Sequence, residues 1–496
     1  MLSLSMIVKN EEKYLKECLT SVQGVVDEII LVDTGSSDST KAIAEEFGAK
    51  IFDYEWKNDF ADARNFALGK TNGDWILYLD ADERLDVKSK KELLRIIQKN
   101  EKKGFYCRIT NVDEITKRPS IMSYVRFFAN YPNIEFEGRV HEQIESSLVK
   151  NGYKISPSSI EIIHVGYNLT EDELKLKAER NLNILEEEYN FNKKGYTAFQ
   201  IGQSLHILDR EDEAVEFFSK SVQDASLRGE YKGTAYRSIA VYNAEKMHFA
   251  EAEKFINLSL KFDSQQPVSL LAAATIYSRV SRFDKAAAAV RNAIKFNKEY
   301  REGKKVSSQN ILVDPKTVIY AGLQIAVMCG DLNLMNYLLT ELKNESPQSE
   351  FDFFHSFLNR RNIDPSSFDL NSIVTKENIE LLFACSKLYG DRTVPLNIIL
   401  SVAEKFNSDS AFLNKLGLLL VESNMDDEAE KMLNKSLELN PKELSSVFYL
   451  ISLYIKQNNL VKVTETIENY RDNFEENSLL KNKLSELEAK LNSFVG

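Results

Sequence analysis

The stretch LYLDADERLD, residues 77–86, decides the fold, because its apolar run ends abruptly in acidic residues. Asp80 and Asp82 follow the apolar residues directly, and Glu83 and Asp86 come soon after. Burying carboxylates at the end of a strand costs free energy unless a partner replaces their lost hydration. A solvated surface turn would explain the pattern, and so would a divalent metal site at the end of a sheet strand. The surrounding sequence is needed to choose between them.

The residues around this stretch alternate between strands and helices over about the first 170 positions. The hydrophobic pattern predicts strands at residues 2–8, 28–32, 50–53 and 75–79, and helices at residues 11–21, 40–47 and 62–68. This order predicts an α/β domain whose sheet is mostly parallel, with helices on both faces. Ligands of such sheets bind beyond the carboxyl ends of the strands. Asp33 and Asp80 both lie there, each directly after an apolar strand.

The composition of the 496 residues limits the classes of protein to which the chain can belong. Its length suggests two to four domains, and the low counts of 9 prolines and 19 glycines favour long helices. The formal net charge of −12 argues against nucleic acid as a partner, since proteins that bind polyanions are usually basic. No apolar run reaches the roughly 18 residues that span a bilayer. Residues 1–8 lack a basic leader and are interpreted as a first strand, not a signal peptide.

The four cysteines, Cys18, Cys107, Cys329 and Cys385, are far apart in the sequence and form no CxxC pair. Their spacing therefore indicates neither a zinc site nor a disulfide framework. Free thiols of this kind are typical of a reducing compartment, so we predict a cytoplasmic protein.

Helical periodicity alone begins near Glu171 and continues to the C-terminal end of the sequence, with an internal repeat. Its first copy has Gly202, Leu205, Ala214 and Phe218 at spacings of 3, 9 and 4 residues. The same spacings recur at Ala240, Asn243, Ala252 and Ile256, at Ala274, Tyr277, Ala286 and Val290, and at Gly417, Leu420, Ala429 and Leu433. Small residues where two helices touch, with larger ones between them, resemble the tetratricopeptide repeat. Such arrays form solenoids whose concave face often holds an extended peptide. The alternative is that the repeats only dimerise or brace the N-terminal half.

These patterns predict four segments along the chain. Residues 1–170 form the α/β domain, residues 171–300 form helical repeats, residues 301–409 form a degenerate helical region, and residues 410–496 form the C-terminal repeats. A weaker fifth copy of the repeat includes Ile451, Tyr454 and Ile467. In the degenerate region, AGLQIAVMCGDLNLMNYLL, residues 321–339, is typical of one helical pair.

Four strings in the N-terminal half resemble, in their order, the family 2 glycosyltransferases with the GT-A fold. They are SMIVKNEEKYLKECLTSV (5–22), EIILVDTGSSDST (28–40), NDFADARNFAL (58–68) and WILYLDADE (75–83). The likeness covers roughly residues 2–168. EFEGRVHEQI (135–144), IIHVGY (162–167) and the first repeat look like bacterial members with a tetratricopeptide tail, among them the bacteriocin-peptide S-glycosyltransferases. The resemblance implies an inverting, metal-dependent transfer of a sugar from a nucleotide diphosphate.

The resemblance implies which residues bind the metal. Asp80 and Asp82 match the DxD motif of the family, and we expect Asp82 to bind Mn²⁺ or Mg²⁺ and Asp80 to contact the donor ribose or the metal through water. A divalent cation acts there as a Lewis acid that draws charge from the leaving diphosphate. Imidazole suits Mn²⁺, so His164 is a candidate ligand of the metal or the diphosphate. The alternative for His164 is a histidine packed at the end of a strand.

Four further residues match positions around the family's nucleotide. Asp33 is expected to accept a hydrogen bond from the uracil ring, and Arg64 to stack on the base or contact a phosphate. Val8, through its backbone, and Glu12 are expected to line the nucleoside pocket. The alternatives are ordinary structural roles: a turn aspartate at Asp33, a surface ion pair at Arg64, and charge complementarity at the start of a helix at Glu12.

Inverting transfer needs one carboxylate to take the acceptor's proton while the nucleophile attacks. Glu142 in GRVHEQI is the candidate general base, with Asp113 or Glu114 in reserve. Arg126 in YVRFF and His141 are candidate contacts to the acceptor or to a phosphate, and the alternative for Arg126 is a structural ion pair.

We therefore predict a glycosyltransferase that moves a hexose or an N-acetylhexosamine from a UDP-sugar to a Ser, Thr or Cys side chain of a protein or peptide. The repeats are expected to contact this acceptor and to make a homodimer plausible. One alternative is transfer to a saccharide or a lipid-linked glycan. Another, from a different class, is a non-catalytic repeat scaffold.

Overall fold

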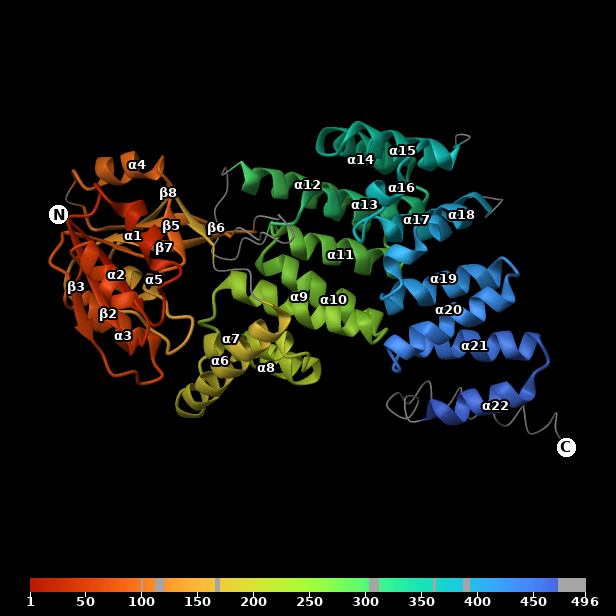
Figure 1. The fold of residues 1–496 in the computed structure, drawn as a ribbon, viewed down its shortest axis with the longest axis horizontal. Helices are drawn as coiled ribbons and strands as arrows, with labels where there is room; N and C mark the ends of the chain where they lie inside the picture. Colours follow the sequence, from red (N-terminus) through yellow and green to blue (C-terminus); the bar gives the residue numbers. More distant parts are fainter. Residues whose placement is uncertain are drawn as a thin grey trace. The chain divides into compact units, whose positions relative to one another are not determined.

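The computed structural model describes residues 1–99, 101–111, 120–165, 170–302, 312–359, 363–386 and 393–471 (Figure 1). The chain divides into two compact units, Met1–Val318 and Ile319–Gly496. The first unit holds a β-sheet and the first set of helical repeats, and the second is helical. Among the described residues, no helix has the length and apolar character that crossing a membrane requires.

An eight-stranded sheet with the order β3-β2-β1-β4-β7-β6-β8-β5 forms the N-terminal part of the first unit. Its strands are β1 (Leu2–Val8), β2 (Glu28–Asp33), β3 (Lys50–Asp53), β4 (Trp75–Tyr78), β5 (Glu83–Leu85), β6 (Lys103–Asn111), β7 (Ser120–Ala129) and β8 (Lys154–His164). The four predicted strands are all present and pair in parallel. β7 adds to β4 in the antiparallel sense, and β6 and β8 form a further parallel pair.

Five helices connect or flank these strands: α1 (Leu15–Val22), α2 (Thr40–Glu46), α3 (Phe60–Leu68), α4 (Ser89–Ile96) and α5 (Glu145–Lys150). α1 begins four residues later than the predicted start at Glu11. Residues 12–14 form a turn instead, in which Tyr14 N and Leu15 N both donate to the carbonyl oxygen of Glu11 over 3.0 and 2.9 Å. The amides of Glu11 and Glu12, which would have no partner within a helix that began there, donate to Thr40 Oγ1 over 2.7 Å and to Asp38 Oδ2 over 3.1 Å.

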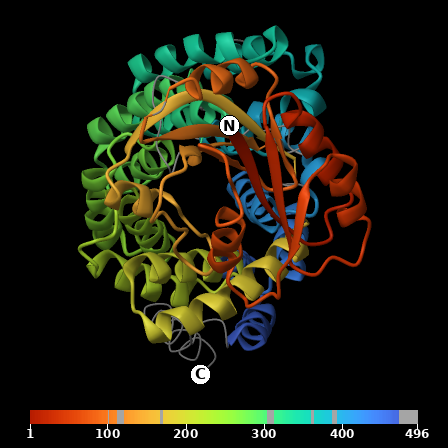
Figure 2. The ribbon, with the colours of Figure 1, turned by 90° about the vertical axis from the view of Figure 1, so that its left-hand side faces the viewer.

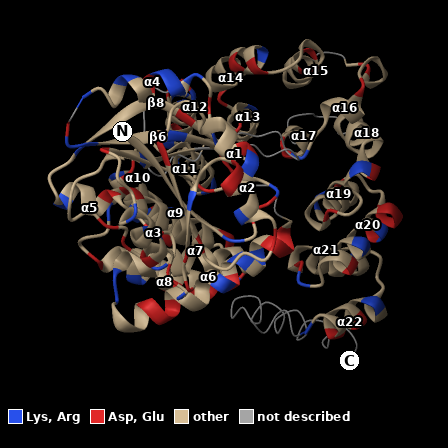
Figure 3. Ribbon diagram, turned by 60° about the vertical axis from the view of Figure 1, so that its left-hand side comes forward, with Lys and Arg blue, Asp and Glu red and all other residues tan. Residues whose placement is uncertain are grey.

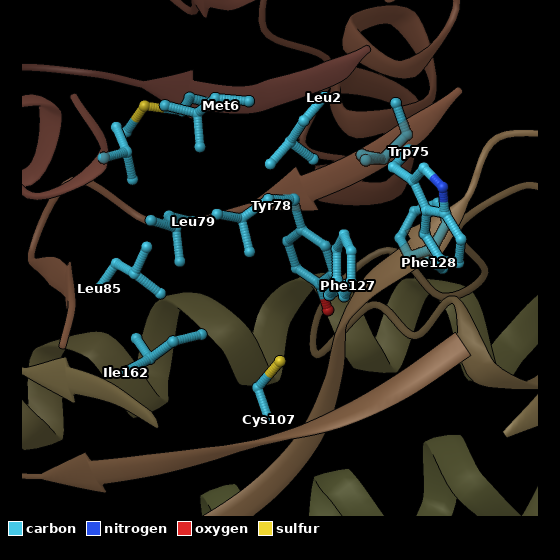
Figure 4. Close-up of a cluster of buried hydrophobic side chains, with 14 of the residues drawn as sticks. Leu2, Met6, Trp75, Tyr78, Leu79, Leu85, Cys107, Phe127, Phe128 and Ile162 are labelled. Atoms are coloured by element: carbon cyan, nitrogen blue, oxygen red, sulfur yellow. The ribbon is translucent and has the colours of Figure 1, made fainter. Parts of the chain in front are cut away.

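The core of the sheet domain consists of apolar side chains from the strands and α1. Figure 4 shows Leu2 and Met6 of β1 facing Tyr78 and Leu79, with Trp75 near Phe127 and Phe128 of β7. The rings of Trp75 and Phe127 are 5.0 Å apart. Both faces of the central strands are buried, so β4 is apolar throughout, while β1 also buries the small polar residues Ser3 and Ser5.

Glu28 is an acidic residue inside this domain, with a side chain only 6% exposed. Its carboxylate accepts hydrogen bonds from Ser3 Oγ (2.6 Å), from the backbone and side-chain amides of Asn72 (2.9 and 2.8 Å) and from Lys50 Nζ (2.8 Å). Burial alone would raise the pKa of Glu28, but the hydrogen bonds from Lys50, Ser3 and Asn72 outweigh it and lower the pKa from 4.5 to about 2. The ionised carboxylate therefore joins β1, β2 and the turn before β4.

Glu28→Gln should destabilise the sheet domain by about 3 kcal/mol at neutral pH, the equivalent of this pKa shift. Because the folded pKa is lowered, the contribution of Glu28 is present above about pH 4.5 and is lost as the pH falls through about 2. Urea unfolding followed by tryptophan fluorescence tests this, since Trp56 and Trp75 both belong to the sheet domain. The gap between wild type and variant should narrow from about pH 7 to about pH 3.5.

The matched control is Glu46→Gln, which removes an exposed carboxylate that lies 3.7 Å from Lys16 Nζ. Exposed pairs of this kind contribute little, so this variant should unfold like the wild type. Equal stability of Glu28→Gln and wild type at neutral pH would contradict the role of Glu28.

Seven helices complete the described part of the first unit before α13: α6 (Glu171–Phe191), α7 (Gly195–Ile207), α8 (Glu211–Gln223), α9 (Gly229–Glu245), α10 (Phe249–Phe262), α11 (Pro267–Arg279) and α12 (Phe283–Arg301). Thr170 starts α6 with a capping box to Glu173. Successive helices, coloured yellow to green in Figure 2, lie side by side. A Cβ atom at Gly202 of α7 would lie 2.8 Å from the ring of Phe218 in α8, so the small residue of the repeat stands where two helices touch.

The division between the units falls inside α13 (Pro315–Cys329). The second unit continues with α14 (Leu332–Glu345), α15 (Gln348–Leu358), η1 (Pro365–Ser367), α16 (Leu370–Ile373), α17 (Ile379–Ser386), α18 (Thr393–Ser401), η2 (Ala403–Phe406), α19 (Ser410–Glu422), α20 (Asp426–Leu439), α21 (Leu444–Lys456) and α22 (Leu460–Asn469). Here a Cβ atom at Gly417 would lie 2.6 Å from Leu433. The predicted segment borders at residues 170, 300 and 409 stay predictions.

Acidic residues gather in the first turns of several repeat helices, where they complement the helix dipole. Glu211, Asp212 and Glu213 open α8, and Asp426, Asp427 and Glu428 open α20, both in red in Figure 3. The pattern stabilises the helix ends and explains part of the net negative charge.

Candidate active site

The carboxyl ends of β1, β2 and β4 meet at one edge of the sheet, where the predicted donor residues lie. Val8 of β1 pairs with Asp33 of β2. Thr34 donates hydrogen bonds from its backbone amide (3.0 Å) and its hydroxyl (3.1 Å) to the carbonyl oxygen of Val8. Asp80 closely follows β4, which is the next strand of the sheet. The edge is therefore the place where a parallel sheet binds its ligands.

Asp33 is buried and its carboxylate is engaged by its own loop. It accepts hydrogen bonds from the backbone amides of Gly35 (3.1 Å) and Ser36 (3.0 Å) and lies 3.4 Å from Lys41 Nζ. Burial alone would raise the pKa of Asp33, but the bonds from Ser36 and Gly35 and the charge of Lys41 lower it. The carboxylate thus fixes the loop at the end of β2, and its contact to uracil stays a prediction.

Two neighbouring glutamates precede α1 at this edge. The exposed Glu12 accepts a hydrogen bond from Ser39 N over 3.1 Å and so helps to join the two loops. Burial together with the charges of Asp82, Asp80 and Asp38 raises the pKa of Glu11 to about 7. Glu11 therefore lies in a region of concentrated negative charge. Sequence reasoning selected Glu12 and missed Glu11, although the two residues are adjacent in the sequence.

Two buried arginines hold Asp80 from either side. Arg64 of α3 donates to Asp80 Oδ1 (2.6 Å) through one guanidinium nitrogen and to Glu142 Oε1 (2.5 Å) through Nε. Arg126 of β7 donates to Asp80 Oδ2 (3.2 Å) and to Glu83 Oε1 (2.7 Å). Burial would raise the pKa of Asp80, but Arg64 and Arg126 hold it well below its usual range. Asp80 is therefore ionised, and the network fixes Glu142 beside it.

The two arginines also stack on one aromatic ring. The guanidinium carbons of Arg64 and Arg126 lie 5.1 and 4.5 Å from the ring centre of Tyr78. This contact and the shared carboxylate of Asp80 hold both guanidinium groups in place. Sequence reasoning named the arginines but missed Tyr78, which looks like an ordinary strand residue, and the part played by Glu83.

Asp82 and His164, the two predicted metal ligands, lie side by side, and their binding of a metal stays a prediction. The Nε2 atom of His164 lies 3.0 Å from Asp82 Oδ2, and its Nδ1 atom lies 2.7 Å from Asn111 Oδ1. Antiparallel pairing of β5 with β8 brings them together, because Glu83 is opposite His164. Burial would lower the pKa of His164, but the hydrogen bond to Asp82 and the charge of that carboxylate raise it.

The donor set at this point fits a divalent cation. The side chains of Asp82 and His164 keep 27% and 22% of their surface exposed, so a ligand can reach them. A carboxylate and an imidazole suit Mn²⁺, and the negative charge around Glu11 favours a cation at this edge. No group of three metal-ligating His, Cys, Asp or Glu side chains is found within the described residues. The remaining ligands would therefore come from the diphosphate and water, as is usual for cations bound with nucleotides.

A cavity of about 260 Å³ opens beside this network. It is lined by Arg64, Tyr78, Asp80, Tyr124, Val125, Arg126, His141, Glu142, Gln143, Ile144, Glu145, Tyr196 and Gln200. The Nε atom of Arg126 is buried there without a hydrogen-bond partner among the described residues. Five predicted residues (Arg64, Asp80, Arg126, His141 and Glu142) thus share one cavity. Asp113 and Glu114, the reserve candidates for the base, lie outside the described residues.

The mostly parallel sheet, with acidic residues and a cavity beyond the carboxyl ends of its strands, is the α/β architecture of the GT-A fold, which confirms the predicted fold class. Comparison with known protein families specifies which family this domain matches. Residues 3–145 match the family described as glycosyl transferase family 2, and residues 410–443 match the tetratricopeptide repeat. The chain therefore contains a glycosyl transferase family 2 domain and, further along, a tetratricopeptide repeat, as the resemblance predicted.

Two relatives are similar to this chain over part of their length. A TPR repeat-containing protein of Synechococcus elongatus is 38% identical over 192 residues, which are 37% of this chain and 47% of the relative. The SPbeta prophage-derived glycosyltransferase SunS of Bacillus subtilis is 31% identical over 229 residues, 45% of this chain and 53% of the relative. The chain thus spans about half the length of these relatives. Among solved structures, S. aureus TarS is 15% identical over 53% of this chain and 55% of that chain, with a TM-score of 0.31.

Proposed function

We propose that this protein transfers a sugar from a UDP-sugar to a Ser, Thr or Cys side chain of a protein or peptide, with inversion at the anomeric carbon. The observation that carries the proposal is the position of Glu142, whose carboxylate lies in the cavity next to Asp80 and is held there by Arg64. A donor bound along the edge formed by Val8, Asp33 and Asp80 would present its sugar to this cavity.

Each side chain at the site has a definite task in this proposal. Glu142 accepts the proton of the attacking hydroxyl or thiol, while Arg64 fixes the direction of its carboxylate. Arg126 and His141 face the same cavity and contact a phosphate or the acceptor. Asp82 and His164 would hold a divalent cation, which when bound supplies Lewis acidity to the leaving diphosphate.

Two observations favour a polypeptide acceptor. The resemblance to the bacteriocin-peptide S-glycosyltransferases extends from the transferase domain into the first repeat. Tyr196 and Gln200 of the repeat helix α7 also line the cavity that contains Glu142. An acceptor that enters this cavity therefore passes along a repeat helix, and repeats of this kind commonly bind peptides.

The test is to incubate the full chain with Mn²⁺, a panel of UDP-sugars and peptides that contain Ser, Thr or Cys. UDP release is measured together with the intact mass of the peptides. We expect release of UDP from one donor and a matching mass increase on the peptide, which distinguishes a hexose from an N-acetylhexosamine. A mass increase only on added oligosaccharides or lipid-linked glycans would contradict the polypeptide acceptor. Absence of UDP release from every donor would leave the non-catalytic scaffold as the better account.

A further inference from the structure

The loop that carries Glu142 has a strained backbone. Glu137 and Gln143 form an isolated antiparallel bridge, with backbone hydrogen bonds of 3.0 and 2.9 Å between them. Within this bridge, His141 adopts a φ of 55°, a region that residues other than glycine rarely occupy. Such a conformation persists only where the surroundings impose it. The residue directly before Glu142 must therefore be held in place by other parts of the protein.

Tyr196 of the repeat helix α7 supplies one hold on this loop. Its hydroxyl donates to the carbonyl oxygen of His141 over 3.2 Å. The same hydroxyl accepts hydrogen bonds of 2.8 Å from Gln143 Nε2 and from Gln200 Nε2. A tyrosine hydroxyl offers one donor and two acceptor sites, so the hydrogen-bonding capacity of Tyr196 is fully used. The bonds reach the residues on both sides of Glu142.

A second tyrosine, Tyr231 of α9, holds the same loop from the next repeat. Its hydroxyl accepts hydrogen bonds of 2.8 Å from Gln143 Nε2 and from Arg228. Arg228 also donates to Glu145 Oε1 over 2.8 Å, at the start of α5. The Tyr231 side chain is buried, and its ring lies 5.1 Å from that of Tyr196. The amide of Gln143 is thus clamped between two tyrosines from two helices.

We propose that Tyr196 and Tyr231 are positioning residues for Glu142, so that the first repeats complete the active site of the transferase domain. The inference rests on the proposed function, because it assigns the tyrosines to the carboxylate that takes the acceptor's proton. Neither tyrosine is assigned a contact to the sugar donor, because the hydroxyl of Tyr196 is fully used by His141, Gln143 and Gln200, and Tyr231 is not among the residues that line the cavity. Loss of the clamp should therefore affect turnover more than donor binding.

The variants are Tyr196→Phe, Tyr231→Phe and the double variant, each of which keeps the ring and removes the hydroxyl. UDP release into water is measured with the UDP-sugar that the wild type turns over fastest. The double variant should lower kcat by about 10- to 100-fold, since small displacements of a catalytic group have effects of this size, and should change KM for the donor by less than about twofold. Tyr242→Phe on the same helix α9, whose hydroxyl binds Asp212, is the matched control and should behave like the wild type.

Two further measurements separate positioning from a purely structural role. In a Glu142→Gln background, the tyrosine changes should lower kcat no further, because they act through that carboxylate. Amide hydrogen exchange at Glu137 and Gln143 should be faster in the double variant than in the wild type and the Tyr242→Phe protein. An unchanged kcat in a folded double variant, or an additive loss in the Glu142→Gln background, would overturn the inference. Should the double variant not fold, Tyr196→Phe alone is measured in the same way.

The exchange measurement keeps this inference distinct from the proposed function. If the wild type releases no UDP, the proposed function fails, and unchanged exchange at Gln143 in the double variant then overturns the clamp as well. If the wild type releases UDP, the kcat values of the tyrosine variants, alone and in the Glu142→Gln background, decide whether the inference holds.

Discussion

Asp82→Asn should lower the rate of UDP release by roughly 10²- to 10³-fold, the usual cost of losing one fixed group that faces developing charge. The substitution keeps the size of the side chain and removes the negative charge that lies 3.0 Å from His164 Nε2. Because Asp82 and His164 are the proposed ligands, the variant should also bind Mn²⁺ more weakly in the presence of UDP. Electron paramagnetic resonance of free Mn²⁺ during a titration measures this independently of turnover.

Asp86→Asn is the control for this experiment, since it makes the same change four residues away. The Asp86 carboxylate accepts a hydrogen bond from Lys88 N over 2.8 Å. The Asp86→Asn variant should leave UDP release and Mn²⁺ binding near their wild-type values. An Asp82→Asn protein that binds Mn²⁺ and releases UDP as the wild type does would contradict the assignment of Asp82 as a metal ligand.

Glu142→Gln should lower kcat for transfer by about 10²- to 10⁴-fold, the range for loss of a general base, with little change in KM for the donor. Glutamine retains a side-chain oxygen that can accept from Arg64 but cannot take a proton. Arg64 also keeps its bond to Asp80, so the network around Tyr78 should survive. Steady-state kinetics with a range of donor concentrations, together with UDP binding by calorimetry, measures both quantities.

Glu137→Gln lies in the same loop and serves as the control. Its carboxylate accepts from Lys150 Nζ over 2.7 Å. Its turnover should match that of the wild type. A Glu142→Gln protein with wild-type kcat would contradict the assignment of Glu142 as the general base. Asp113→Asn and Glu114→Gln would then be the next variants to measure.

Much of the sheet could be predicted from the sequence because its signals are local. The strands at Leu2–Val8 and Lys50–Asp53 were predicted to the residue, since continuous apolar or alternating runs end at polar loops. The start of α1 was not, because residues 12–14 form a turn in place of a regular helix, and the amides of Glu11 and Glu12 bind Thr40 and Asp38, which lie far away in the sequence. Local patterns contain no information about such long-range caps.

The candidate site likewise combines residues that can be predicted from the sequence with residues that only the fold brings together. Asp80 and Asp82 follow a buried strand, and their position and their spacing of two residues are visible in the sequence alone. Tyr196 and Gln200 carry no such signal, because they look like ordinary polar positions of a repeat helix. Only the fold brings them to Glu142, more than 50 residues earlier in the sequence. Likewise, the buried pairing of Arg64 with Glu142 joins residues 78 positions apart.

Val140 lies in one apolar cluster with Leu182, Phe199 and Leu205 of the first repeat helices. Arg139, beside it, donates from its backbone amide and its guanidinium group to Glu188 and Glu187 of α6. Recombination that exchanged these helices for those of another protein would uncover Val140 and remove the bonds of Arg139 to α6, leaving its bond to Asn58. We therefore expect α6 to α9 to be inherited together with residues 137–145.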